Sequence, residues 1–175
     1  MTRLQPLVLT LQLDAISFAI FDDLRRRHFA PERNLVPAHI TLFHALPGAE
    51  KRELVVALQR VSSQTPILDL SFPGVRFLGQ GVAIEVQSPG LLALRKRLAS
   101  QWRRWLVAQD KQSYQPHITI QNKVSGSQAR RLLERLRATW EPRPGKGEGL
   151  QLWHYRGGPW TLVGEFPFGK SDPPR

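Results

Sequence analysis

Two short segments of the sequence combine an imidazole with a hydroxyl at the same spacing. His39 and Thr41 occur in the first segment, His-Ile-Thr-Leu, and His117 and Thr119 in the second, His-Ile-Thr-Ile. A histidine can accept or donate a proton near neutral pH. Two histidines on opposite sides of a phosphodiester could therefore act in line, one on an attacking water and the other on the leaving oxygen. The threonine hydroxyls could hold the non-bridging oxygens, where negative charge grows in the transition state.

The two segments belong to a longer internal repeat. An offset of 78 residues relates His39 to His117 and Thr41 to Thr119. Further identical pairs at this offset are Gly48 and Gly126, Arg52 and Arg130, Leu54 and Leu132, and Leu58 and Leu136. No gap is needed across this window, which indicates an internal duplication. One isolated His-x-Thr is usually an ordinary piece of strand, whereas two copies at equivalent places favour a functional pair.

Alternation within each segment predicts which side chains are buried. Residues two apart share a face of a β-strand, so His39 and Thr41 are expected on one face, and Ile40 and Leu42 in the core on the other. The second segment repeats this arrangement. By the same parity His44 falls on the Ile40 face, and we expect it to be a strand-end residue without a catalytic role.

Composition limits the kinds of site that the chain can build. Its 175 residues fit one ordinary domain, and the absence of cysteine excludes disulfides, thiolate zinc sites and a cysteine nucleophile. No Asp or Glu accompanies either tripeptide and no close His-x-x-x-His pair occurs, so a histidine-based metal site is the weaker alternative.

Charge and hydropathy indicate the class of partner. The chain has 25 Lys+Arg against 14 Asp+Glu, a formal net charge of +11, which attracts phosphorylated ligands and polyanions but also fits a soluble basic surface. The N-terminal residues alternate apolar with polar and contain no continuous apolar segment. We therefore expect a cytoplasmic protein with no membrane partner.

Hydrophobic periodicity predicts an α+β protein. Helical spacing is expected over residues 15–29, 50–63, 89–107 and 127–140, and strand alternation over 7–14, 39–42, 68–72, 75–78, 82–86, 117–120, 150–156 and 160–168. On the third helix Arg95 is expected among the surface charges. No flexible linker is evident, so we expect one domain over residues 1–175, with pseudo-repeats of about 1–73 and 74–170. This order predicts two sheets that face a central cleft.

The paired motifs, 78 residues apart and each preceded by a proline (Pro37, Pro116), resemble those of the 2H phosphoesterase superfamily. The likeness is to its 2′-5′ RNA ligase-like, or LigT-like, proteins, and it covers nearly the whole chain. It implies a duplicated bilobal fold with two antiparallel sheets and outer helices, and a metal-independent site without a cofactor. It also implies cyclic phosphodiesterase chemistry on RNA ends or small nucleotides, which opens a 2′,3′-cyclic phosphate to a 2′-phosphate; some relatives also join RNA through a 2′-5′ bond.

Residue by residue, the resemblance makes His39 the general acid and His117 the general base. Thr41 and Thr119 become the hydroxyls that hold the phosphate. The implied partner is an RNA end or a cyclic nucleotide, and we expect a monomer.

The sequence departs from the family at one position. RNA-directed members often continue the second motif to an arginine, where this chain has Asn122 followed by Lys123. Lys123 is thus a candidate phosphate contact, although an ammonium cannot form the forked pair of a guanidinium. The alternative function is an RNA-binding module that keeps the pocket without turnover. Its basic helices favour binding, whereas the intact His and Thr of both copies favour an enzyme.

Overall fold

The computed structural model describes residues 4–169 and contains both helices and strands. In chain order these are β1 (Leu7–Leu13), α1 (Ala15–His28), β2 (Ile40–Leu46), α2 (Lys51–Gln64), β3 (Leu68–Phe72), β4 (Val75–Phe77), β5 (Val82–Glu85), α3 (Pro89–Gln101), β6 (His117–Gln121), α4 (Gly126–Thr139), β7 (Arg143–His154) and β8 (Thr161–Pro167).

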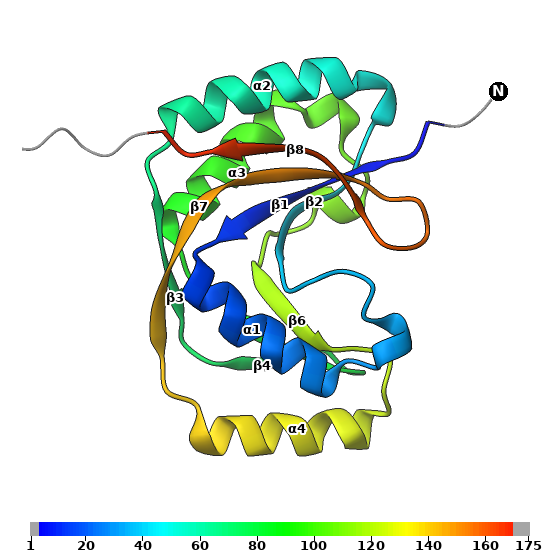
Figure 1. Cartoon of the computed structure of the whole chain (residues 1–175), viewed down its shortest axis with the longest axis vertical. Helices are drawn as coiled ribbons and strands as arrows, with labels where there is room; N and C mark the ends of the chain where they lie inside the picture. Colours follow the sequence, from blue (N-terminus) through cyan, green and yellow to red (C-terminus); the bar gives the residue numbers. More distant parts are fainter. Residues whose placement is uncertain (1–3, 170–175) are drawn as a thin grey trace, which may run out of the picture.

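The strands form two antiparallel sheets. The larger sheet has the order β2-β1-β7-β3, with β8 paired to the far part of β7, and the smaller has the order β4-β5-β6. Strands β2 and β6, which carry the two motifs, lie in different sheets and contact one another (Figure 1). The predicted α+β fold, with two antiparallel sheets about a central cleft and helices outside, is confirmed.

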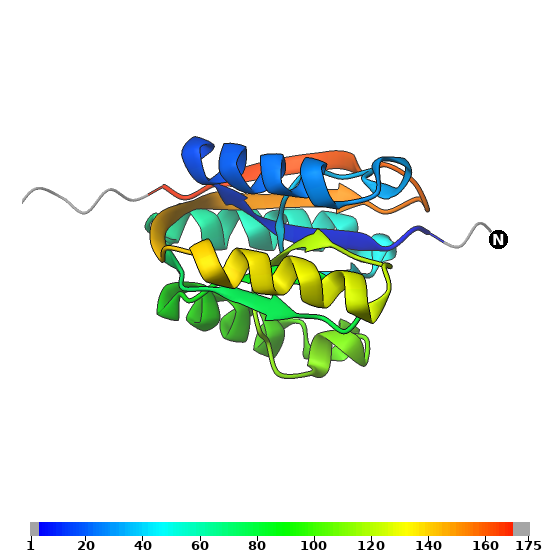
Figure 2. The ribbon, with the colours of Figure 1, turned by 90° about the horizontal axis from the view of Figure 1, so that it is seen from below.

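Each sheet is covered by one helix from each half of the chain. Helix α2 packs on β7 and β8 and α3 on β3, whereas α1 packs on β6 and α4 on β4 and β5 (Figures 1 and 2). The two sequence repeats therefore interleave in space, since each lobe takes a helix from both. Within residues 4–169, none of these helices is long and apolar enough to cross a membrane.

Local signals in the sequence begin the helices as expected. Asp14 caps α1 by accepting a hydrogen bond from the Ser17 N–H at 2.9 Å, and Ser88 caps α3, which has Pro89 in its first turn. The predicted extension of α3 to residue 107 is wrong. Trp102 leaves the helix with φ −103° and ψ 16°, because its buried ring packs edge-on against Phe43 with centroids 5.4 Å apart.

Strand β2 contains one residue more than its partner. The pairing of β1 with β2 steps from Thr10 opposite Thr41 to Leu9 opposite Phe43, which leaves Leu42 as a β-bulge. Such an extra residue reverses the side-chain parity beyond it. Ile40, Leu42 and Phe43 are all buried. The expected position of His44 is therefore wrong: it points to the Thr41 face and not to the Ile40 face.

Strand β6 carries a bulge at the equivalent place. Its pairing with β5 steps from Ala83 opposite Thr119 to Val82 opposite Gln121, which leaves Ile120 as the extra residue. Ile120 lies 78 residues after Leu42, so the duplication includes this irregularity as well as the motif. Ile118 and Ile120 are fully buried, as the alternation predicts.

Candidate active site

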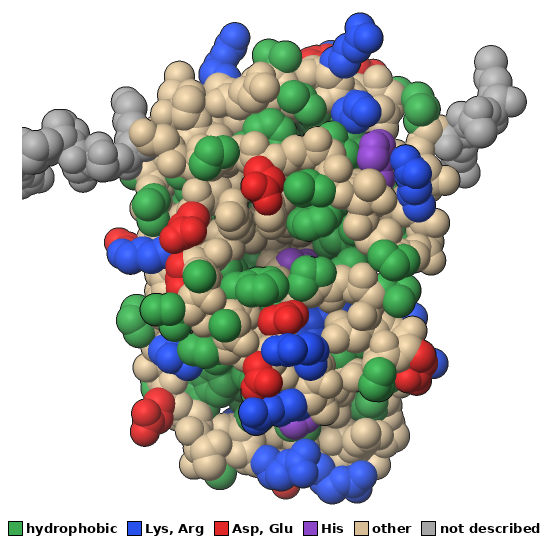
Figure 3. Space-filling model, viewed as in Figure 1, with side chains coloured by type: hydrophobic (Ala, Val, Ile, Leu, Met, Phe, Trp, Pro, Cys, Tyr) green, Lys and Arg blue, Asp and Glu red, His purple; other side chains and the backbone are tan. Residues whose placement is uncertain are grey.

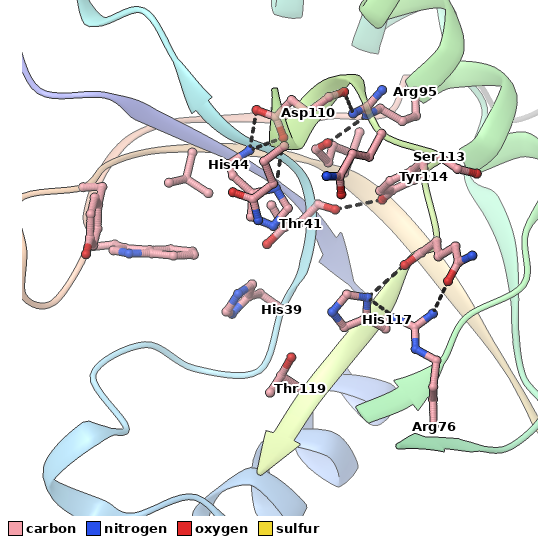
Figure 4. A pocket seen from close by; sticks show the side chains of 17 residues that line it. His39, Thr41, His44, Arg76, Arg95, Asp110, Ser113, Tyr114, His117 and Thr119 are labelled. Atoms are coloured by element: carbon pink, nitrogen blue, oxygen red, sulfur yellow. Dashed lines mark hydrogen bonds and ion pairs between the residues drawn. The ribbon is translucent and has the colours of Figure 1, made fainter. Parts of the chain in front are cut away.

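A cavity of about 640 Å³ opens between the two sheets and brings the paired motifs together. His39, Thr41, His117 and Thr119 all line it. Figure 3 shows a hollow near the centre of one face, with histidine atoms at its floor and hydrophobic side chains beside it. Figure 4 shows the two imidazoles side by side, with Thr41 and Thr119 on either side of them. Residues far apart in the sequence thus surround one volume.

The same main-chain contact orients both imidazoles. Nδ1 of His39 lies 2.8 Å from the carbonyl oxygen of Pro37, and Nδ1 of His117 lies 2.8 Å from that of Gln115. A neutral ring that donates through Nδ1 keeps a lone pair on Nε2. Each histidine is therefore held by the carbonyl two residues before it, in the tautomer that can accept a proton at Nε2.

Burial and neighbouring cations depress the pKa of both histidines. Burial lowers the pKa of His39 to about 4, against the opposing effect of the Pro37 carbonyl, and positive charge on Arg25 and His117 lowers it further. Burial also lowers the pKa of His117, helped by the charge of Arg76. Both rings are therefore neutral in the ligand-free site at pH 7. A bound anion would raise both pKa values by favouring the imidazolium.

Arg76 competes for the ring nitrogen of His117. Its Nη2 lies 2.8 Å from Nδ1 of His117, and its Nη1 donates to Oε1 of Gln115 at 2.9 Å. Nδ1 can donate to the Gln115 carbonyl or accept from Arg76, but one nitrogen cannot do both at once. Arg76 lines the cavity and thus combines a positive charge at the site with control over the tautomer of His117.

A third histidine, which the sequence did not predict, lines the same cavity. Nδ1 of His44 lies 2.9 Å from the carboxylate of Asp110, which is 1% exposed and also accepts from the main-chain N–H groups of His44 and Ala45. Burial alone would raise the pKa of Asp110, but these hydrogen bonds lower it below its usual value. The bulge turns His44 to this face, and Asp110 fixes its ring there (Figure 4).

The buried Arg95 holds the bulge of β2, contrary to its predicted surface position. Its Nε donates to the Leu42 carbonyl at 2.8 Å and its Nη2 to the Asp110 carbonyl at 2.6 Å. The guanidinium lies over the ring of Phe43, 4.1 Å from its centroid. Tyr114 completes the arrangement by donating to the Thr41 carbonyl at 2.9 Å. Main-chain groups that the bulge frees from the sheet thus find side-chain partners.

The structure does not bring Lys123 to the cavity. Arg76 and Arg95 are the lysine or arginine residues that line it within the described chain. Lys123 has a left-handed backbone with φ 57°, and its carbonyl accepts from Arg33 at 3.5 Å. Among residues 4–169, no group of three or more His, Asp or Glu side chains is placed to hold a metal ion.

Comparisons with known proteins agree with this architecture. A model of the 2′-5′ RNA ligase superfamily matches residues 13–159. The crystal structure of TT0787 from Thermus thermophilus is similar with a TM-score of 0.68 at 15% identity, covering 95% of this chain and 100% of that one. E. coli LigT complexed with 3′-AMP has a TM-score of 0.66 at 21% identity, with 95% and 99% covered. At these identities the likeness shows a shared fold. No curated protein sequence matches the chain.

Proposed function

The chain belongs to the 2′-5′ RNA ligase superfamily, and from this premise we propose that it is a metal-independent cyclic phosphodiesterase. Its substrate is a 2′,3′-cyclic phosphate on an RNA end or a small nucleotide, and its product is a 2′-phosphate. The observation that carries the proposal is the meeting of two His-x-Thr pairs in one cavity. The similar E. coli LigT was solved with 3′-AMP, which supports a nucleotide as the ligand.

The reaction is an in-line displacement at phosphorus. Nε2 of one imidazole takes a proton from water as its oxygen bonds to phosphorus, and the other imidazolium gives its proton to O3′ as the P–O3′ bond breaks. The phosphate stays on O2′, and one proton has been taken up and one released. The hydroxyls of Thr41 and Thr119 donate to the non-bridging oxygens, and Arg76 adds positive charge near them.

The family resemblance makes His39 the acid and His117 the base, and electrostatics supports that order. The pKa of His39 falls to about 4 and that of His117 falls less strongly. The imidazolium with the lower pKa is the stronger acid, and the imidazole with the higher pKa is the stronger base. The protonation state that carries the reaction is then a minor one in the free protein, and a bound phosphate increases it.

The same site supports 2′-5′ ligation. If the 5′-hydroxyl of a second RNA replaces water, its oxygen bonds to phosphorus while O3′ leaves, which gives a 2′-5′ linkage and a free 3′-hydroxyl. The proton transfers at His39 and His117 are unchanged. Hydrolysis and ligation therefore differ only in the attacking hydroxyl.

Turnover of 2′,3′-cyclic nucleotides tests the proposed activity. We expect His39→Ala and His117→Ala each to lower kcat by about 10²–10⁴-fold. His28→Ala is the matched control, because His28 lies on α1 outside the cavity. Undiminished turnover in both active-site variants contradicts the proposal.

A substrate that needs no leaving-group protonation tests the two roles. With a p-nitrophenyl phosphodiester, His39→Ala should lose little activity, since p-nitrophenolate leaves without an acid. His117→Ala should remain inactive, because water still needs a base. The reverse pattern would exchange the roles.

RNA binding without turnover is the second candidate function. Helix α4 exposes Arg131, Arg135 and Arg137, and basic side chains gather over the lobe of α1 and α4 (Figure 3). This function predicts RNA binding that weakens steeply with salt and does not respond to EDTA, with no product from any cyclic phosphate. The absence of binding at low salt rules it out.

A further inference from the structure

A second cavity of about 340 Å³ adjoins the catalytic one. His39 and Trp160 line both cavities and so form the wall between them. The remaining lining is largely apolar and includes Phe18 and Trp153, with the polar side chains of Gln12, Glu148 and Gln151. Its volume lies within the usual range for small-molecule sites.

Aromatic side chains from separate elements line this second cavity. The Trp160 ring is 4.7 Å from the His39 ring and 6.2 Å from the Trp153 ring, measured between centroids. Trp153 is fixed because its Nε1 donates to Oγ1 of the buried Thr10 at 2.9 Å. Phe18, on α1, leaves 38% of its surface exposed although it is a large aromatic residue. The cavity thus presents aromatic surface that the fold itself does not cover.

We propose that this second cavity binds the nucleobase of the substrate. The inference depends on the proposed function, in which His39 protonates O3′ and the ribose therefore lies against His39. The base is attached to the same ribose, so its nearest apolar enclosure is the cavity beyond the His39 ring. Aromatic side chains stack on any base, because every base has a π face.

The proposal defines a substrate class. The enzyme requires an aromatic base on the cyclic phosphate but discriminates weakly among bases, since stacking is tolerant of sequence. The amides of Gln12 and Gln151 can donate to or accept from base edges, although Gln151 already donates to Glu165 at 3.1 Å.

The test compares a cyclic nucleotide with a probe that lacks the base. The substrates are adenosine 2′,3′-cyclic phosphate and 1-O-methylribose 2,3-cyclic phosphate, and the measured quantity is the ratio of their kcat/KM values. We expect the wild type to prefer the nucleotide by roughly tenfold or more. Phe18→Ala and Trp153→Leu should each reduce this ratio several-fold. Ile16→Ala is the matched control, since Ile16 is a 74% exposed apolar residue of α1 outside the cavity.

The outcomes separate this inference from the proposed function. Equal turnover of the two substrates by the wild type overturns the base site and leaves the phosphodiesterase intact. Turnover of neither substrate overturns the phosphodiesterase. Tryptophan fluorescence then decides the base site: quenching by adenosine 2′-phosphate but not by ribose phosphate, lost in Trp153→Leu, supports it, and quenching by neither ligand overturns it.

Discussion

The guanidinium of Arg25 donates a hydrogen bond of 2.8 Å from Nη1 to the main-chain carbonyl of Thr119, 94 residues further along the chain. Arg95 makes the corresponding contact in the opposite direction, from Nε to the carbonyl of Leu42 at 2.8 Å. Each arginine thus extends from a helix to the histidine strand of the other half of the chain. Two buried cations thereby help to set the relative position of the two His-x-Thr pairs.

Each arginine also binds the loop that precedes a catalytic histidine. Arg25 donates from Nε to the side chain of Asn34, five residues before His39. Arg95 donates to the main chain of Asp110, in the loop before His117. Burial lowers the pKa of Arg25 to about 10, which leaves it charged at neutral pH. One side chain therefore connects the approach to one histidine with the strand of the other.

Replacing Arg25 should destabilise the fold far more than replacing its neighbour. Arg25→Met leaves the Thr119 carbonyl and the Asn34 amide without their charged donor, which should lower the free energy of unfolding by about 2–3 kcal/mol. Arg26→Met is the control, because the Arg26 side chain is 65% exposed and pairs with Asp22 at 3.6 Å; its change should stay below about 0.5 kcal/mol. Urea denaturation measures both. Equal losses contradict a special role for Arg25.

Asp110 should be similarly important for the bulge of β2. Asp110→Asn retains one acceptor oxygen but cannot satisfy the ring of His44 and two main-chain N–H groups, so we expect a loss of about 1–3 kcal/mol. Asp69→Asn is the control, because the Asp69 side chain is 88% exposed in its ion pair with Lys146, and its change should stay below about 1 kcal/mol.

The pKa of Asp110 gives this prediction a pH dependence. The folded-state pKa lies below the unfolded value of 3.8, so the folded state binds fewer protons in this range. The carboxylate therefore stabilises the fold above pH 4, and this stabilisation is lost as the pH falls through the folded-state pKa. Asp110→Asn should flatten that acid decline in unfolding free energy. An unchanged decline would show that other carboxylates cause it.

The sequence predicted the features that depend on local pattern. Strand alternation correctly separated Ile40 and Leu42 from His39 and Thr41, because each pair lies before or at the bulge. The 78-residue repeat predicted that the two histidines occupy equivalent strands, and they line one cavity.

The missed features depend on contacts between distant residues. A bulge has no signature in the alternation of β2, since Leu42 and Phe43 are both apolar, and so His44 was assigned to the wrong face. Arg95 has the composition of a surface residue, and its burial depends on carbonyl groups that the bulge exposes. Neither carbonyl is identifiable until the chain is folded.

The paired histidines predict an acidic optimum for kcat/KM. In-line catalysis needs one ring charged and the other neutral, and both pKa values in the free protein lie below 6.5, with His39 at about 4. Activity should rise as the pH falls from 8, reach its maximum below pH 6.5 and then decline as the second ring becomes protonated. These limbs belong to the pair and not to either residue alone. A pH–rate profile under kcat/KM conditions measures them, and a maximum above pH 7 contradicts the depressed pKa values.

Arg76 should control the pKa of His117 without taking part in proton transfer. Arg76→Met removes a positive charge and a hydrogen-bond donor 2.8 Å from Nδ1 of His117, so the imidazolium becomes less unfavourable and the pKa of His117 should rise. NMR titration of the imidazole resonances measures this directly, without substrate. Arg97→Met is the control, because Arg97 is exposed on α3, outside the cavity, and donates to Gln64 at 3.4 Å. The same variant should bind inorganic phosphate more weakly, since a cation that lines the cavity is lost. A His117 pKa that falls or stays constant in Arg76→Met would show that the guanidinium acts on the ring only through packing.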